Sequence, residues 1–246
     1  MNGLPKIMVL SLQESRDRRE NFIQQGVAKN YKFVTVPRFK DTGQTLLGAE
    51  MLHPNSYGPV ASHLANLFVW YRTSSDPYCI VMEDDVSFDT VKYWNFTFKE
   101  FIEELPSNWE AVQLVVVSEN REPPKFRRRL ITDWCAAVFL MKREYVKNLL
   151  AKHVVLPDIF NIYIDSTTLP IVENVLFDSK NPNVYSYPLF LEDVSNCKST
   201  YIGTELPLYN GQGPEHHESH NFILNWWKNN KITLKDIFYE SSTTSD

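Results

Sequence analysis

A run of apolar residues that ends at three consecutive acids constrains the fold of this chain more than any other feature. Residues Cys79 to Met82 are all apolar, as in a strand buried within a parallel sheet, and Glu83, Asp84 and Asp85 follow directly. In an open α/β sheet, ligands bind outside the carboxyl ends of the strands. Carboxylates there can hold a hard divalent cation, and that cation can bind a diphosphate. A solvated acidic turn fits the same residues, and the triplet alone does not decide between the two.

Strand patterns and helix patterns alternate from residue 6 to about residue 152. This alternation predicts an α/β fold with a mostly parallel sheet and helices on both of its faces. The expected strands are 6–12, 31–36, 79–82, 111–117 and 134–141, with a short edge strand at 184–188 that ends in proline. The expected helices are 16–27, 58–71, 94–105 and 142–152, and a helix broken at Pro170 within 158–172. Residues 38–55 and 118–130 are expected to be loops.

Composition excludes several classes of protein. The formal net charge of -5 gives no support to nucleic-acid binding, which needs clustered basic residues. A basic run, Lys125–Arg129, follows two prolines and is expected to be a solvated loop, with a contact to phosphate or to an acidic acceptor as the alternative. Three cysteines without a CxxC pattern argue against a zinc site and a disulfide framework. The sequence contains no run of about 18 apolar residues, so no membrane span is predicted. We expect one domain over residues 1–240 and a disordered polar tail at 241–246.

The N-terminal residues lack the apolar core of a signal peptide, so we expect a cytoplasmic protein.

The first expected strand leads through a polar turn, Gln13–Arg19, into a helix. The N-terminus of a helix behind a strand is a ready site for a phosphate or a nucleoside. We place Arg18 beside that ligand, whereas the neighbouring Arg16 and Arg19 are expected on a solvated helix face.

A glycine-rich turn, Asn210–Pro214, occurs late in the chain. Its two glycines, Gly211 and Gly213, would let the backbone approach a diphosphate closely. Three histidines follow it, and they suggest metal binding without the spacing of a zinc hydrolase: His216, His217 and His220.

Other polar and aromatic side chains have both a structural and a functional interpretation. His63 lies in the expected helix 58–71, where a single histidine is more often structural. Asp165 stands among apolar residues, where a carboxylate is costly unless it has a partner or a function. Trp226 and Trp227 either pack on the core, which is favoured, or offer a stacking face for a sugar.

Several of these features together resemble glycosyltransferase family 25, which includes lipooligosaccharide galactosyl- and glucosyltransferases and collagen hydroxylysine galactosyltransferases. The segment from Leu10 to Arg18 is similar to the opening "NLxxxxDR" of that family, with Ser11 in place of its asparagine. The segment 185–202 resembles a late strand and "SSI" region more loosely. The central match is the pattern Gly58, Ser62, His63, Leu64, followed by Glu83, Asp84 and Asp85.

A second, local resemblance is to the glycosyltransferase domain of lysyl hydroxylases. The turn Asn210–Pro214 is similar to the HGNGP turn of that domain, where the histidine is a metal ligand. Asn210 stands in its place here. An amide oxygen is a neutral and weaker ligand than imidazole or carboxylate. The third metal ligand is therefore Asn210 or one of the histidines at 216, 217 and 220.

The two resemblances imply a GT-A-type, Rossmann-like fold, a UDP-sugar donor carrying galactose or glucose, and Mn²⁺ or Mg²⁺. Because side chains alternate along a strand, Glu83 and Asp85 are expected to bind the metal and Asp84 the ribose or the sugar. Ser11 and Arg18 would border the nucleoside pocket. Asp165 is the candidate general base if the reaction inverts, with Asp158 in reserve.

Two functions remain open at this point. The first is a metal-dependent hexosyltransferase that acts on a hydroxyl of a glycan or of a hydroxylysine-type acceptor, as in lipopolysaccharide biosynthesis or collagen glycosylation. The second is a catalytically inactive relative that binds glycans or serves as a scaffold, which the asparagine at position 210 would favour. The first is the preferred prediction.

Overall fold

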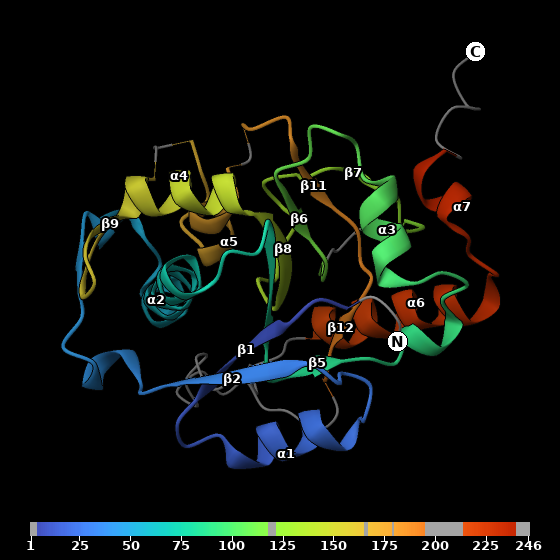
Figure 1. The fold of residues 1–246 in the computed structure, drawn as a ribbon, viewed down its shortest axis with the longest axis horizontal. Coiled ribbons are helices and arrows are strands. Elements are labelled where there is room, and N and C mark those ends of the chain that lie inside the picture. Colours follow the sequence, from blue (N-terminus) through green and yellow to red (C-terminus); the bar gives the residue numbers. More distant parts are fainter. Residues whose placement is uncertain (1–3, 118–121, 165–166, 179, 195–213, 240–246) are drawn as a thin grey trace.

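The computed structural model describes residues 4–117, 122–164, 167–178, 180–194 and 214–239 of the chain. Within these residues, seven strands form a central sheet in the order β2-β1-β4-β8-β6-β11-β7 (Figure 1). The bounds of these strands, in chain order, are β1 (Ile7–Leu12), β2 (Tyr31–Val36), β4 (Tyr78–Glu83), β6 (Ala111–Gln113), β7 (Arg127–Arg128), β8 (Val138–Lys142) and β11 (Val184–Ser186).

The sheet is mostly parallel, as predicted. β1 pairs in parallel with both β2 and β4, and β11 pairs in parallel with β6. β8 lies antiparallel between β4 and β6, and β7 lies antiparallel beside β11. A parallel connection needs a long crossover, usually a helix, and the described residues between β6 and β8 contain none.

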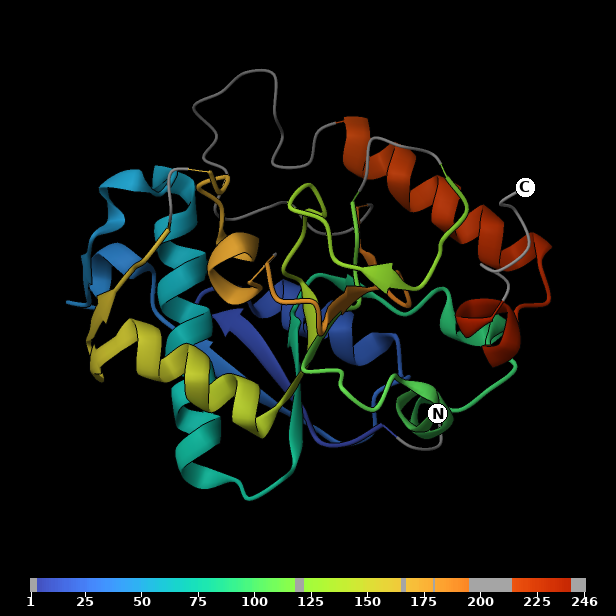
Figure 2. The same cartoon turned by 90° about the horizontal axis from the view of Figure 1, so that it is seen from above.

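Helices cover both faces of the sheet, which confirms the predicted α/β architecture (Figures 1 and 2). No helix in the described ranges is both long enough and apolar enough to cross a membrane. One face carries α1 (Arg16–Gln24), α3 (Phe98–Glu104), α6 (Pro214–Asn229) and α7 (Leu234–Phe238). The other face carries α2 (Tyr57–Thr73), α4 (Arg143–His153) and α5 (Val172–Leu176).

The buried strand β4 supplies both cores. Its side chains alternate between the two faces of the sheet. Ile80 and Met82 pack into the core beneath α1, α3, α6 and α7, whereas Cys79 and Val81 pack into the core beneath α2, α4 and α5. All four are almost fully buried. This double burial explains why the strand is a continuous apolar run, as the sequence indicates.

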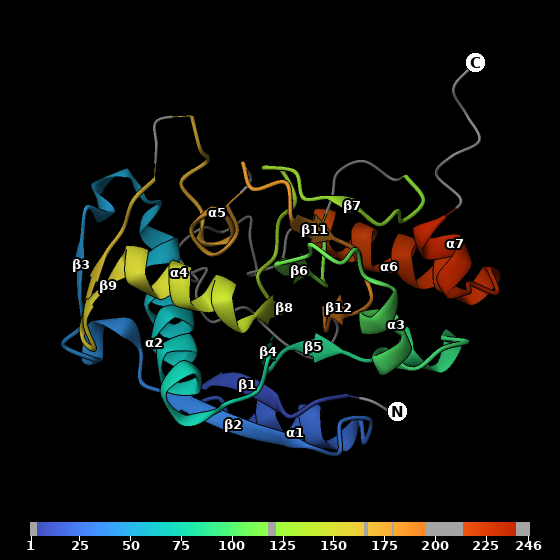
Figure 3. The ribbon, with the colours of Figure 1, turned by 45° about the horizontal axis from the view of Figure 1, so that its top comes forward.

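Two smaller sheets and four short 3₁₀ turns complete the described structure (Figure 3). The predicted helix within 158–172 is wrong, because most of its described residues are not helical and α5 begins only at residue 172. Residues 38–55 are also more ordered than the predicted loop. The elements are β3 (Thr45–Leu47), β10 (Ile159–Asn161) and β9 (Val154–Leu156) in one sheet, β5 (Val86–Ser87) and β12 (Leu191–Glu192) in the other, and η1 (Phe39–Asp41), η2 (Ala49–Met51), η3 (Pro54–Ser56) and η4 (Val91–Tyr93).

Some predicted boundaries move for local reasons. α3 begins at Phe98 instead of residue 94, because Thr97 caps it: the Thr97 hydroxyl accepts from the Glu100 N–H and the Glu100 carboxylate accepts from the Thr97 N–H. The predicted edge strand at 184–188 is β11, which is not an edge strand, because β7 pairs with it. The predicted tail at 241–246 lies outside the described residues.

The basic run is only partly solvated: Lys125 and Arg128 are exposed, but Arg127 and Arg129 are held within the fold. Arg129 is 3% exposed, and its Nε donates to Oε1 of Gln113 at 2.7 Å. Arg127 binds both carboxylate oxygens of Asp133 at 2.6 Å. A guanidinium group has several donors in a planar fork, so it can be buried wherever acceptors surround it. The sequence shows the charges but not these acceptors.

His153 is fully buried at the end of α4 and gives the fold a pH-sensitive point. Its Nδ1 donates to the Asn161 carbonyl at 3.1 Å, and its Nε2 is buried without a hydrogen-bond partner among the described residues. Burial lowers the pKa of His153 from its ordinary 6.5 to about 4. The neutral ring is therefore the form that suits the folded state.

We expect this histidine to destabilise the protein as the pH falls from about 6.5 to about 4, because the unfolded chain binds the proton first. At 1.36 kcal/mol for each pKa unit, the loss approaches roughly 3 kcal/mol. The measurement is urea unfolding of the wild type and of His153→Gln across this range. The difference in unfolding free energy between the two should shift in favour of the variant as the pH falls. A pH-independent difference would contradict the prediction.

Candidate functional site

The acidic triplet lies at a switch point of the sheet. From β1 the chain moves to β2 on one side, and it then crosses to β4 on the other side of β1. Such a reversal of strand order leaves a crevice at the carboxyl ends of the two strands, which is where open α/β sheets bind ligands. Glu83 is paired with Leu10 of β1, so Ser11 and the triplet lie side by side at this point. The predicted neighbours are thus brought together.

The three acids divide differently from the prediction. β4 ends at Glu83, and Asp84 and Asp85 form a turn that leads into β5. Strand alternation therefore does not apply beyond Glu83. The Oε1 atom of Glu83 accepts from Nε2 of His63 on α2 at 3.0 Å. Asp84 and Asp85 both face Arg18, so strand alternation does not separate these two side chains in this structure.

Arg18 of α1 lies beside the end of β4. Its Nε is 2.8 Å from Oδ1 of Asp84, and its NH2 group contacts Asp85. The side chain is 10% exposed. Arg16 is exposed, as expected for a solvated helix face. One buried guanidinium therefore bridges two buried carboxylates.

Arg19 corrects another part of the prediction, because it is not simply solvated. Its NH1 group donates to Oγ of Ser11 at 2.7 Å and to the Leu12 carbonyl at 2.5 Å, and its NH2 group donates to the Gln13 carbonyl at 3.1 Å. These bonds fix the carboxyl end of β1 against α1. The two adjacent arginines thus hold the ends of the two strands that border the crevice.

Burial dominates the electrostatics of the triplet. It raises the pKa of Asp84 and of Asp85, and the charge of Arg18 opposes the rise. The carboxylates of Glu83 and Glu192 raise the pKa of Asp85 further. Oδ2 of Asp84 and Oδ1 of Asp85 are buried and have no hydrogen-bond partner among the described residues. Buried oxygens without a partner are costly, and a bound cation or donor would satisfy them.

These oxygens are hard donors, which are the ligands that Mn²⁺ and Mg²⁺ take in proteins. Within the described ranges, no three side chains of the types His, Cys, Asp and Glu are close enough together to hold a metal ion. The predicted third ligand, Asn210, and the glycines Gly211 and Gly213 lie outside the described residues. The donor chemistry of the triplet fits a hard cation.

Sequence reasoning missed a second acidic pair, Glu192 and Asp193. The Asp193 N–H donates to the Asp85 carbonyl at 2.6 Å, and Nδ2 of Asn21 donates to Oδ2 of Asp193 at 2.5 Å. β12 also pairs with β5, which follows the triplet directly. The signal was present, because Glu192 and Asp193 end an apolar run just as the triplet does.

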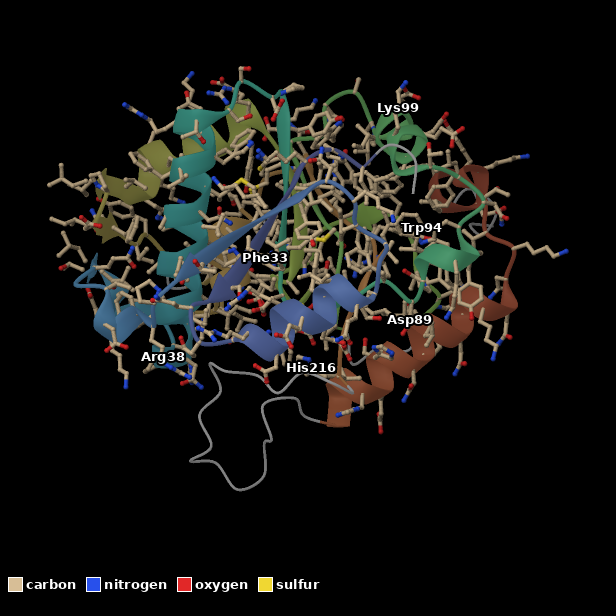
Figure 4. All side chains as sticks on the ribbon, turned by 60° about the horizontal axis from the view of Figure 1, so that its bottom comes forward. Phe33, Arg38, Asp89, Trp94, Lys99 and His216 are labelled. Carbon is tan, nitrogen blue, oxygen red and sulfur yellow. The ribbon has the colours of Figure 1, made fainter. Side chains whose placement is uncertain are left out.

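Two of the three histidines after the glycine-rich turn meet Glu192. Nδ1 of His216 lies 2.5 Å from Oε2 of Glu192, and Nδ1 of His220 donates to the Glu192 carbonyl at 2.8 Å. Burial alone would raise the pKa of Glu192, but the hydrogen bond and the charge of His216 outweigh it and lower that pKa. His217 is exposed. Figure 4 shows His216 at the start of α6.

The remaining candidates lie elsewhere. Asp158, the reserve base, is exposed in the turn between β9 and β10, where its carbonyl accepts from the Thr45 N–H at 2.9 Å. Asp165 lies outside the described residues. Trp227 is fully buried and donates to the Pro188 carbonyl at 3.1 Å, so this tryptophan packs in the core, as favoured.

A cavity of about 140 Å³ lies between residues 122–133, β11 and α6. Its lining includes Arg127, Asp133 and Ser186, which are joined by hydrogen bonds, and the apolar side chains of Val116 and Phe222. Val116 follows β6, and β6 runs in the same direction as β4. The cavity therefore lies at the same end of the sheet as the triplet, beside the carboxyl end of β6 and on the far side of β8 from β4.

No family model matches the chain, and no curated protein sequence matches it. Solved structures to which the chain is similar include a glycosyltransferase involved in the glycosylation of the major capsid of PBCV-1, at 12% identity and a TM-score of 0.39, over 75% of this chain and 82% of that chain. A197 from STIV is 12% identical with a TM-score of 0.38, over 76% of this chain and 84% of that chain. Likenesses this distant leave the resemblance to glycosyltransferase family 25 unconfirmed.

The bridge between Arg18 and the two aspartates predicts a large cost for its removal. Arg18→Met should destabilise the protein by roughly 3–5 kcal/mol, because it leaves two buried carboxylates without their cation. The matched control is Arg16→Met on the exposed face of α1, which should change stability by less than about 0.5 kcal/mol. The measurement is urea unfolding at neutral pH. Equal effects of the two substitutions would show that the buried bridge is not needed for stability.

Proposed function

We propose that this protein is a glycosyltransferase that takes a hexose from a nucleotide-sugar donor with the help of a divalent cation. The observation that carries the proposal is the buried acidic triplet at the switch point between β1 and β4. Oxygen-rich sites at such crevices suit a cation and a diphosphate together. The mostly parallel sheet with helices on both faces is consistent with the GT-A-type fold that the resemblance implies.

On the donor side, Ser11 and Arg18 would border the nucleoside, and Asp84 would face the ribose or the sugar. Ser11 and Asp84 are buried at the crevice, and Arg18 joins the latter to α1. Gly211 and Gly213 would let the backbone approach the diphosphate. The resemblance favours UDP-galactose or UDP-glucose as the donor.

The cation, Mn²⁺ or Mg²⁺, would be held by Glu83 and Asp85, with Asn210 or a histidine of the 216–220 segment as a further ligand. When bound, such an ion neutralises the charge that grows on the departing diphosphate. His63 orients Glu83 through the 3.0 Å hydrogen bond. Arg18 adds a second positive charge to the same place.

The acceptor would be a hydroxyl of a glycan or of a hydroxylysine-type residue, and the cavity beside β11 offers room for part of it. Asp165 stays the predicted base on this side if the reaction inverts. The alternative function, an inactive glycan-binding or scaffolding relative, predicts binding of a glycan without consumption of a donor.

We expect UDP with Mn²⁺ to raise the melting temperature. A ligand at about 100 times its Kd stabilises by ~2.7 kcal/mol, which corresponds to roughly 5–10 °C for a chain of this size. Asp85→Asn should abolish the shift, because it removes a charge from the cation site. Asp89→Asn, on the exposed side of the same turn region, is the matched control and should retain it. No shift with UDP, GDP or their sugars, with either ion, would contradict the proposal.

Hydrolysis of UDP-galactose or UDP-glucose in the presence of Mn²⁺ separates the enzyme from the inactive relative. The enzyme should release UDP slowly with water as the acceptor, and Asp85→Asn should not. Donor binding without any release of UDP, or of product with added acceptors, would favour the inactive relative.

A further inference from the structure

The chain enters β8 through an unusual corner at Cys135. This residue has a φ of +90°, and residues other than glycine rarely adopt a positive φ. Gln113 holds the corner, because its Nε2 lies 3.2, 2.9 and 2.8 Å from the carbonyls of Asp133, Trp134 and Cys135. In a trans peptide, C=O and N–H point in opposite directions. The Cys135 N–H therefore points away from Gln113, and it donates to Oε1 of Glu173 at 2.7 Å.

Glu173 is a buried carboxylate without a paired cation among the described residues. It is 8% exposed, and its Oε1 accepts from the Cys135 N–H at 2.7 Å. Arg129 is near, but its donors go to Gln113 at 2.7 Å, to Asn174 at 2.9 Å and to the Asp133 carbonyl at 3.0 Å. A buried carboxylate without an ion-pair partner is costly, and such a side chain is a candidate for a function.

The Cys135 corner also places Glu173 at the acidic triplet. Sγ of Cys135 donates to Oε1 of Glu192 at 3.1 Å, and the Ala137 carbonyl accepts from the Glu83 N–H at 2.7 Å. α5, which carries Glu173, packs against α2, which carries the His63 that binds Glu83. Glu173 and Glu83 thus belong to the same side of the sheet, next to the carboxyl end of β4.

We propose that Glu173 is the general base of the transfer reaction, an inference that rests on the proposed function. Its carboxylate would take the proton of the acceptor hydroxyl. The hydroxyl oxygen then forms a bond to the anomeric carbon, and the bond from that carbon to the diphosphate oxygen breaks, with its electron pair leaving on the nucleoside diphosphate. The Cys135 N–H holds Oε1, which leaves Oε2 for the proton.

The environment suits this role. Burial raises the pKa of Glu173 and outweighs the lowering by backbone hydrogen bonds and by the charge of Arg129, and the charge of Glu83 adds a smaller rise. A carboxylate with a raised pKa is a stronger base than an exposed one. The strained corner at Cys135 aims a donor at one oxygen of Glu173, and so it would fix the orientation of the carboxyl group.

The test compares Glu173→Gln with the wild type in donor hydrolysis, with UDP-galactose or UDP-glucose, Mn²⁺ and water as the acceptor. A glutamine can still accept the Cys135 N–H through its amide oxygen, but it cannot take a proton. We expect release of UDP to fall by about 100-fold or more. The melting-temperature shift with UDP and Mn²⁺ should remain. Glu144→Gln, an exposed position on α4, is the control and should be unaffected.

Rescue by azide distinguishes a general base from a residue that only supports the structure. Azide attacks without losing a proton, so it should restore release of UDP by Glu173→Gln and yield the glycosyl azide. Hydrolysis within a few-fold of the wild type, or a loss that azide does not restore, would overturn the assignment. Rescue by azide in Asp165→Asn but not in Glu173→Gln would give the role to Asp165. A wild type that neither binds nor hydrolyses any donor would instead remove the proposed function itself.

Discussion

The contact between Arg18 and the two aspartates at the end of β4 is the interaction on which the rest of this structure depends. Asp84 and Asp85 are 2% and 7% exposed, and carboxylates so deeply buried need a cation. Arg18 reaches them from α1, and its neighbour Arg19 fastens the end of β1 to the same helix. The docking of α1, the ends of two central strands and the crevice between them are therefore one coupled unit.

The reversed strand β8 makes the second half of the site. Because β8 runs antiparallel to β4, its first residues and the Cys135 corner before them lie beside the carboxyl end of β4. If β8 were parallel to β4, its last residues would lie there. Gln113 and Arg129 hold this corner with buried hydrogen bonds, and each has its acceptors within the fold. Glu173 and Glu192 then approach the triplet from elements that are far apart in the sequence.

Local patterns were enough to predict the first half of the site but not the second. The apolar run before Glu83 and the polar turn before Arg18 each lie within a few residues of the side chain they position. Glu173 depends on the direction of β8 and on the φ of Cys135, which are set by long-range pairing and by Gln113. The capping pair of Thr97 and Glu100 was readable, since a threonine followed three residues later by a glutamate marks a helix start.

The balance of charge at the crevice bears on how a donor would arrive. The described residues place more carboxylates than arginines at the crevice, and like charges in a poorly solvated site repel strongly. A nucleoside diphosphate without a counter-ion would meet that repulsion. A divalent cation bound to the diphosphate removes it and satisfies the unpartnered oxygens of Asp84 and Asp85 at once. If the protein binds nucleotide sugars, we infer that cation and donor enter together, because each makes the other's binding favourable. The carboxylates concerned are Glu83, Asp84, Asp85, Glu173 and Glu192.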